Sequence, residues 1–207
     1  MERESAKGIL GEAFLGPEEL RPLLGELGFG QAGVPEVDVP YDADTLACAA
    51  AGGYVLVFCP SRVDGVPITL RLLRSHFGVD PAVSEPCFYN QDWYLAESFL
   101  DLPLDGRWHL VKKTVQEDSR AVQPADLVEA GYTFPSAVLC AWTFFAWYYA
   151  RKEFLWWHDF VWCSDTDHNG DRVYVGKYHD IDGVNKNGFS VHRHLALRPC
   201  YGAVRCL

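Results

Sequence analysis

The sequence predicts an α+β fold in which a small, irregular antiparallel sheet packs around one buried apolar helix. Residues 135–150 begin with proline, which suits the first turn of a helix, and are apolar on every side. Four short segments follow with the residue types and spacing of hairpin strands, namely 160–163, 172–175, 189–194 and 202–206. A helix that is apolar all round needs packing on all sides, so we expect the rest of the chain to surround it.

The first part of the chain predicts a helix, a connector, a strand and a second helix. Residues 17–27 place leucines at helical spacing, whereas residues 30–45 are rich in Gly, Pro and Asp and show no period. Residues 54–59 form a continuous β-prone run between glycines and a proline, which is typical of a central strand. Residues 67–78 space their apolar side chains for a one-sided helix, which Gly78 can end.

The middle of the chain is less regular. Residues 93–100 fit either a strand or a helix. Residues 108–115 alternate enough to predict a strand with one face open to solvent, and residues 124–131 predict a short helix that ends at glycine. We therefore expect an N-terminal helix and connector over residues 1–50 and the main domain over residues 51–207.

Composition excludes several classes of function. The 18 basic and 28 acidic residues give a net charge of −10, which repels phosphate backbones and argues against binding to nucleic acid or to anionic membranes. The apolar run 137–150 is shorter than the roughly 20 residues that a membrane-spanning helix needs, so we expect no membrane insertion.

The cysteines and the N-terminus indicate the compartment. Seven cysteines, an odd number without a C-x-x-C pair, are typical of small buried side chains in a reducing environment. Residues 1–7 are charged and no apolar stretch follows them, so no secretory signal is visible and a cytoplasmic protein is the default expectation.

Several short motifs between residues 105 and 207 occur together. Gly131-Tyr132 precedes Pro135-Ser136-Ala137 at the start of the apolar helix, and the run from Trp108 to Lys113 forms the strand upstream. The motifs that follow are Trp162-Cys-Ser-Asp165, Gly170-Asp-Arg-Val-Tyr-Val-Gly176 and Gly188-Phe-Ser-Val191. In this order they resemble C-type-lectin-fold proteins, in particular the variable proteins of diversity-generating retroelements and related bacterial proteins with the formylglycine-generating-enzyme-like fold.

The resemblance implies a C-type-lectin-like scaffold that binds ligands without catalysis and without a cofactor. Its partner is then an unknown protein or another macromolecule, bound by a variable surface near the C-terminus. On this chain the implied surface covers residues 174–201. Its candidate ligand-binding residues are Tyr174, Tyr178, His179, Asp180, Asp182, Asn185, Lys186, Asn187, His192 and His194.

Strand alternation gives Tyr174 two interpretations. Val173 and Val175 share one face of their strand and are expected to be buried, which turns Tyr174 toward the other face. Tyr174 then belongs to the ligand-binding surface, or it packs beneath a loop.

Two patterns raise the question of a metal. Residues 165–171 imitate the start of a calcium loop, but the twelfth position is Gly176 instead of glutamate, and Asn169-Gly170 is a strong hairpin signal. We therefore predict a turn there. His192 and His194 lie on one strand face and, with His179, Asp180 or Asp182 as a further ligand, fit zinc or iron, although we favour hydrogen-bonding or recognition roles. Arg193 points to the opposite face, where we expect it to pair with a carboxylate.

The alternative function is a metal- or thiol-dependent enzyme on a formylglycine-generating-enzyme-like fold. It places His192 and His194 at its centre, together with a nearby carboxylate or Cys200. Formylglycine-generating enzymes use a pair of cysteines, and Cys200 and Cys206 raise the same possibility here. A reactive thiol needs a cationic, partly exposed setting, so we expect both cysteines to be structural.

Overall fold

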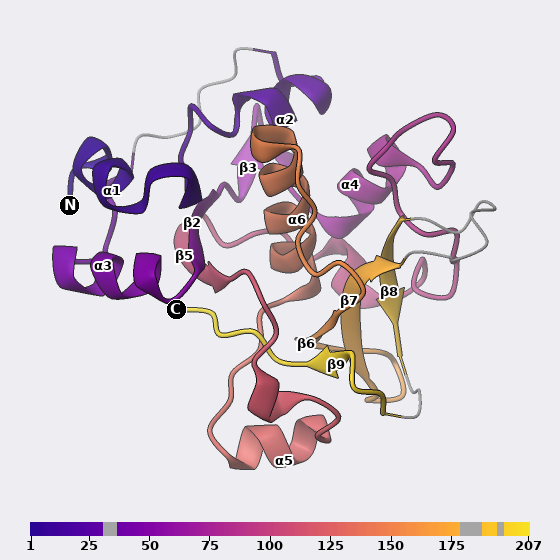
Figure 1. The fold of residues 1–207 in the computed structure, drawn as a ribbon. Helices are drawn as coiled ribbons and strands as arrows, with labels where there is room; N and C mark the ends of the chain where they lie inside the picture. The colour runs from indigo at the N-terminus through magenta and orange to yellow at the C-terminus, as the bar shows by residue number, and fades with distance from the viewer. Residues whose placement is uncertain (31–36, 179–187, 194–196) are drawn as a thin grey trace.

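The chain folds around helix α6 (Ala137–Arg151), which lies between two small sheets (Figure 1). The structure is a computed structural model and describes residues 1–30, 37–178, 188–193 and 197–207. Helices and small mixed sheets together make it an α+β fold, which confirms the predicted class.

Helix α6 is the buried apolar helix that the sequence predicts. Its first eleven residues, Ala137 to Trp147, are all buried. Ser136 caps the helix by accepting a hydrogen bond from the backbone N–H of Leu139, and the Asp165 carboxylate accepts another from Ala137. These two caps fix the N-terminal end of the helix.

The first sheet has the strand order β1-β2-β5. Strand β2 (Tyr54–Cys59) is central, as predicted, and pairs antiparallel with β5 (Arg107–Lys112). Strand β1 (Phe14–Leu15) pairs with it in parallel on the other side. The indole N–H of Trp142 donates to the carbonyl of Phe58 at 2.9 Å, which connects this sheet to α6.

The C-terminal residues lie along the free edge of β5. The backbone groups of Leu110 and Leu207 exchange two hydrogen bonds of 2.9 Å, and the N–H of Lys112 donates to the carbonyl of Arg205. Val111 is thereby paired antiparallel with Cys206. This pairing brings the end of the chain next to residues 107–109.

The second sheet has the strand order β8-β7-β6-β9. Strands β6 (Phe160–Thr166), β7 (Arg172–Tyr178) and β8 (Gly188–His192) are antiparallel neighbours. Strand β9 (Tyr201–Gly202) is shorter than predicted and runs parallel to β6. The sheet is therefore mixed, which corrects the expectation of a purely antiparallel one.

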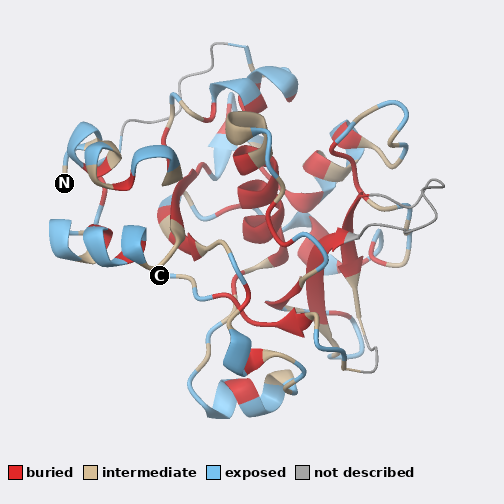
Figure 2. Cartoon of the chain, in the orientation of Figure 1, coloured by how far each residue is buried: buried red, intermediate tan, exposed pale blue. Residues whose placement is uncertain are grey.

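Both faces of the second sheet are covered (Figure 2). On one face the side chains of Val173, Val175 and Val191 join the large hydrophobic cluster that contains α6. On the other face Tyr174 and Trp162 belong to a second cluster. The inner strand β7 is consequently buried on two sides.

The remaining helices are α1 (Arg3–Leu10), α2 (Arg21–Glu26), α3 (Ala43–Ala51), α4 (Leu70–Phe77) and α5 (Pro124–Glu129). Three 3-10 turns cover Gly11–Ala13, Ser98–Asp101 and Glu117–Ser119, and a small hairpin joins β3 (Arg62–Val63) to β4 (Val66–Pro67). The undecided stretch 93–100 is therefore a turn leading into a 3-10 helix. Helices α1 and α3 were not predicted, and their Leu10 and Leu46 join the same cluster as α6.

Membrane-spanning length is not reached by any helix within the described ranges. The longest, α6, has 15 residues.

Candidate functional site

Most of the predicted ligand-binding residues fall outside the described part of the chain. These are His179, Asp180, Asp182, Asn185, Lys186, Asn187 and His194. Tyr178 is the last residue of β7 and pairs with Gly188 of β8. Their role in binding stays a prediction.

Tyr174 does not lie on the surface, which corrects its predicted role in ligand binding. Its side chain has no exposed area and its ring packs against Trp162, Phe160 and Tyr201, with centroid separations of 5.0, 5.7 and 4.8 Å. The predicted burial of Val173 and Val175 is confirmed, because both side chains belong to the cluster that contains α6. The second face of the sheet, however, is covered by α5, whose Leu127 belongs to the same cluster as Tyr174.

His192 is partly buried and serves the packing of the sheet. Its ring stacks on Tyr174 with centroids 5.5 Å apart, and Nδ1 accepts a hydrogen bond of 3.0 Å from the Gln91 side-chain amide. Burial lowers the pKa of His192 to about 4. The imidazole is therefore neutral at physiological pH.

The predicted surface is attached to the sheet at two separate places. Residues 179–187 connect the end of β7 to the start of β8, whereas residues 194–196 follow the other end of β8. A strand of five residues spans roughly 13 Å between its first and last Cα atoms. The two attachment points therefore lie at opposite ends of β8.

The turn 165–171 forms as predicted, and the guanidinium of Arg193 binds one of its carboxylates. The Asp167 carboxylate accepts backbone hydrogen bonds of 2.9 Å from Asn169 and Asp171. Its second oxygen accepts a hydrogen bond from Arg193, which confirms the predicted pairing of that arginine with a carboxylate. Burial acts to raise the pKa of Asp167, but these donors outweigh it and lower the pKa to about 2.

Glu97, Asp167 and His168 bring three potential metal-ligating atoms close together. Arg193 lies among them, bound to Asp167 and 3.6 Å from the nearer Glu97 oxygen. His168 already contacts Glu97 through Nδ1 at 2.6 Å. Arg193 is thus within ion-pair distance of both carboxylates, so the group is accounted for as an ion-pair network.

An aromatic cluster, consisting of Tyr148, Phe154 and Trp157, lies partly open to solvent beside the end of β7. The rings of Tyr148 and Phe154 stack with centroids 4.8 Å apart, and Trp157 lies 5.1 Å from Phe154. The Trp157 side chain is 45% exposed. Its backbone forms a parallel bridge to Lys177, two residues before the segment 179–187.

The loop that carries Phe154 and Trp157 has a strained backbone and is held by a buried charge. Trp156 and His158 have φ values of 50° and 64°, in the left-handed region that side chains other than glycine rarely adopt. The Lys177 ammonium lies 4.5 Å from the Phe154 ring centroid and donates to Glu85 at 3.0 Å. These contacts fix the aromatic rings in position.

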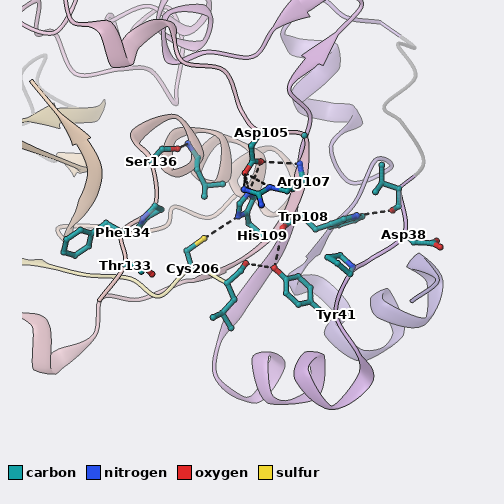
Figure 3. A pocket seen from close by; sticks show the side chains of 16 residues that line it. Asp38, Tyr41, Asp105, Arg107, Trp108, His109, Thr133, Phe134, Ser136 and Cys206 are labelled. Carbon is teal, nitrogen blue, oxygen red and sulfur yellow. Dashed lines mark hydrogen bonds and ion pairs between the residues drawn. The ribbon is translucent and has the colours of Figure 1, made fainter. Parts of the chain in front are cut away.

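A pocket of about 660 Å³ lies against β5, beside the N-terminal end of α6 (Figure 3). Four segments far apart in the sequence line it: residues 37–41, residues 105–109, residues 133–139 and residues 206–207. The indole N–H of Trp108 donates to the carbonyl of Val37 at 3.0 Å, which attaches the first segment to β5. The volume is within the usual range for small-molecule sites.

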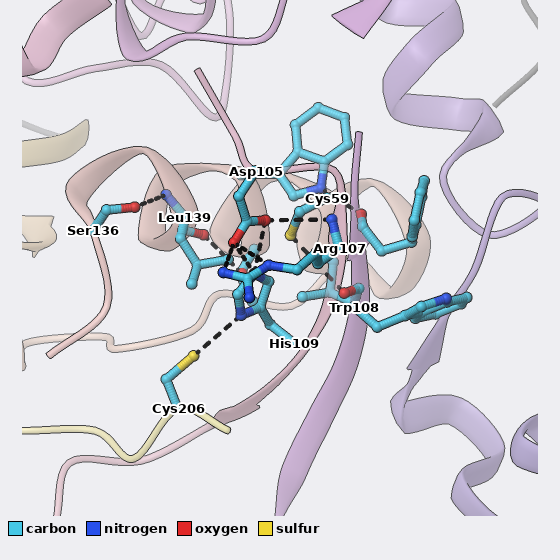
Figure 4. A network of polar contacts seen from close by, with 12 residues as sticks. Cys59, Asp105, Arg107, Trp108, His109, Ser136, Leu139 and Cys206 are labelled. Carbon is cyan, nitrogen blue, oxygen red and sulfur yellow. Dashed lines mark hydrogen bonds and ion pairs between the residues drawn. The ribbon is translucent and has the colours of Figure 1, made fainter. Parts of the chain in front are cut away.

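Within the pocket, Cys206, His109 and Asp105 form a continuous polar network (Figure 4). The Cys206 Sγ atom lies 3.7 Å from His109 Nδ1. On the other side of the ring, His109 Nε2 lies 2.9 and 3.0 Å from the two Asp105 carboxylate oxygens. Asp105 also accepts hydrogen bonds from the Arg107 guanidinium.

The charges of this network follow from its contacts. Burial acts to raise the pKa of Asp105, but hydrogen bonds from His109 and Arg107 outweigh it, so the pKa is lowered and the group is a carboxylate. Since a carboxylate only accepts, the neutral tautomer of His109 that fits this contact carries its proton on Nε2 and leaves Nδ1 to accept from the thiol. Burial raises the pKa of Cys206 to about 12, so the resting group is a neutral thiol.

Sequence reasoning missed Asp105 and His109. The pair is separated by a glycine turn and the first residues of a strand, which is no recognisable motif. Cys206 was considered only together with Cys200. The carbonyl of Cys200 accepts from the Phe160 N–H, and its partly buried side chain packs against the cluster that contains Tyr174.

No protein-family model, curated protein or solved structure matches the chain.

Proposed function

We propose that the chain is a ligand-binding protein that presents the aromatic cluster, together with residues 179–187, to a protein ligand. The position of Trp157 carries this proposal. Its side chain is 45% exposed, and it is paired with Lys177 at the point where the segment 179–187 leaves the sheet. Exposed aromatic side chains supply large contact areas at low cost in conformational entropy, and they dominate binding energies at interfaces.

The frame beneath this surface supports the proposal. Strand β7 is buried on both faces, so the folding free energy of this region resides in inward residues such as Val175 and Tyr174. Residues 179–187 connect two strands that are already fixed by their pairing. Substitutions in such a connection leave the frame unchanged. The resemblance to C-type-lectin-fold variable proteins adds the expectation that this segment differs between related copies.

The charge of the chain favours a protein over a nucleic acid as the ligand. Lys177 is only 2% exposed and is paired with Glu85. At a net charge of −10, the chain has no excess of basic groups to displace the counterions of a phosphate backbone, so it has no general attraction to nucleic acid.

A display experiment tests the proposal. Positions 179, 180, 182, 185, 186 and 187 are randomised on yeast-displayed chain, and the library is selected for binding to hen lysozyme as a probe protein. We expect most members to retain the parent's thermal stability and binders to emerge. In a selected binder, Trp157→Ala should weaken binding at least about tenfold without lowering the melting temperature.

A matched library at exposed residues of α5 (125, 126, 128 and 129) is the control. Equal enrichment of binders from α5, or loss of folding in most members of the first library, would contradict the proposal. The retroelement assignment is tested separately by sequencing the DNA beside the gene. We expect a reverse transcriptase gene and a near-copy of the C-terminal codons that differs at adenines.

A further inference from the structure

The pocket beside β5 holds a nucleophile, a base and an orienting carboxylate in series. Cys206 Sγ faces His109 Nδ1 at 3.7 Å, and both oxygens of Asp105 hold Nε2 on the far side of the ring. This order, in which a base contacts a nucleophile and is itself oriented by a third group, is the general signature of an activated nucleophile. Ordinary packing of a buried cysteine needs neither the histidine nor the carboxylate.

We propose that Cys206 is a nucleophilic thiol that accepts the acyl group of a small carboxylic ester bound in this pocket. His109 is the general base and Asp105 is a positioning residue that keeps the ring in the required tautomer. This activity is independent of the protein-binding surface, because the pocket lies at the N-terminal end of α6, whereas Tyr148 of the aromatic cluster lies near the C-terminal end of that helix. It also replaces the Cys200-centred interpretation with a site on another edge of the fold.

The catalytic cycle returns Cys206 to the free thiol with water as the only co-reactant. Sγ attacks the ester carbonyl carbon while its proton moves to His109 Nδ1, and the alcohol leaves with that proton as the C–O bond breaks. The product is a thioester on Cys206. Water then attacks the thioester carbonyl, His109 takes its proton and returns it to Sγ, and a carboxylic acid leaves.

The protonated resting state agrees with this order of events. A thiol that is neutral before attack depends on a neighbouring base for deprotonation during the attack itself, so His109 contributes directly to the rate. A permanently ionised thiolate would have no such dependence on the histidine.

The walls of the pocket indicate the substrate class. Tyr41, Trp108, Phe134 and Leu139 give it an apolar and aromatic lining that suits a short hydrocarbon acyl group. Ser136, the N-cap of α6, also lines the pocket, so the N-terminal end of this helix forms part of its wall. Arg107 adds a cation bound to Asp105.

The seven cysteines provide an internal comparison. Cys59, Cys87, Cys140 and Cys163 are buried, whereas Cys48 is exposed in α3 and has greater access to reagents than Cys206. A purely accessibility-driven reaction therefore labels Cys48 first. A reaction driven by the histidine labels Cys206 first.

The test incubates the full chain with p-nitrophenyl acetate and maps acetylated cysteines by mass spectrometry over time. We expect Cys206 of the unaltered protein to be acetylated faster than Cys48, with p-nitrophenol released beyond one equivalent. Preferential acetylation of Cys48 would overturn the proposal without any substitution. Cys48→Ser is the matched control and should leave turnover unchanged.

Variants then separate the roles. Cys206→Ser should abolish the fast release of p-nitrophenol. His109→Gln should slow acetylation of Cys206 by about 100-fold. Asp105→Asn should slow it at least about tenfold, because an amide can stabilise the wrong tautomer, and Asp105→Glu should restore it. Each variant is compared with the parent by circular dichroism and urea unfolding. An undiminished rate in a folded His109→Gln protein would refute the assignment.

Discussion

His109 and Cys206 are 97 residues apart in the sequence, yet Nδ1 and Sγ are 3.7 Å apart. Their proximity follows from one register, in which Val111 of β5 is opposite Cys206. Because side chains alternate along a strand, a slip of one residue would turn Cys206 away from the imidazole. Two reciprocal hydrogen bonds between Leu110 and Leu207 fix that register.

Gly176 provides a test of packing in the second sheet. A Cβ atom at this position would lie 2.1 Å from the Asp159 carbonyl oxygen, which is backbone and has little freedom to move. Gly176→Ala should therefore lower the free energy of unfolding by about 1–3 kcal/mol in urea titrations. Gly8→Ala is the control, since Gly8 lies in α1 with open space around it. We expect it to stabilise by up to about 1 kcal/mol, and equal effects of the two variants would contradict this account.

The Lys177–Glu85 pair should respond unequally to loss of either partner. Lys177 is 2% exposed and Glu85 is 39% exposed, so removing the carboxylate leaves a buried charge, whereas removing the amine leaves a hydrated one. Glu85→Gln should lower the free energy of unfolding by about 1–3 kcal/mol, which is less than the loss expected for a fully buried pair. Lys177→Met should lower it by less than Glu85→Gln does. The double variant should resemble Lys177→Met. A larger loss in Lys177→Met than in Glu85→Gln would be inconsistent with a pair of this kind.

Asp167 should contribute to acid unfolding. Its pKa is lowered to about 2 in the folded chain against about 3.9 in an unfolded one, so its ionised form stabilises the fold above pH 4. This contribution is lost as the pH falls from about 4 to 2. The difference in urea midpoint between the parent and Asp167→Asn should therefore be largest near pH 5 and should shrink toward pH 2. A constant difference over this range would show that the carboxylate charge has no part in stability.

His192 should change the stability of the fold over a different pH range from Asp167. Its pKa is lowered to about 4, whereas an unfolded histidine titrates near 6.5, so between these values the unfolded chain binds more protons. Stability is then highest above pH 6.5 and falls as the pH decreases to about 4. His192→Phe keeps a ring against Tyr174 and should flatten this part of the stability profile. The midpoint of urea unfolding at half-unit pH steps measures it, and an unchanged slope would argue against burial of the imidazole.

Much of the fold could be predicted because its principal elements have local patterns. Helix α6 and strand β2 are continuous apolar runs between turn-forming residues, and the hairpin from β6 to β7 is marked by Asn169-Gly170. Helix α3 was not predicted, because its cap, the Asp42 carboxylate that accepts from the Thr45 N–H, directly follows a Gly- and Pro-rich stretch without a helical period. Strand β1 has two residues, whose extended state depends on pairing with β2.

The candidate sites depend on contacts that a single sequence does not display. Alternation indicated correctly that Tyr174 turns away from α6, but the cover supplied by Leu127 of α5 is a tertiary feature. Likewise, nothing near Cys206 in the sequence indicates that its partner is His109. The exposure of Trp157 is likewise a tertiary feature, since the same residue type at position 156 is buried.

The burial of β7 on two sides also determines how the protein unfolds locally, and therefore how fast its backbone amides exchange with solvent. The β7 backbone pairs with β6 on one side and with β8 on the other, and hydrophobic clusters shield both faces of the strand. The amide proton of Val175 should accordingly exchange with deuterium only when the whole chain unfolds. Its exchange rate then measures global stability under native conditions, without denaturant.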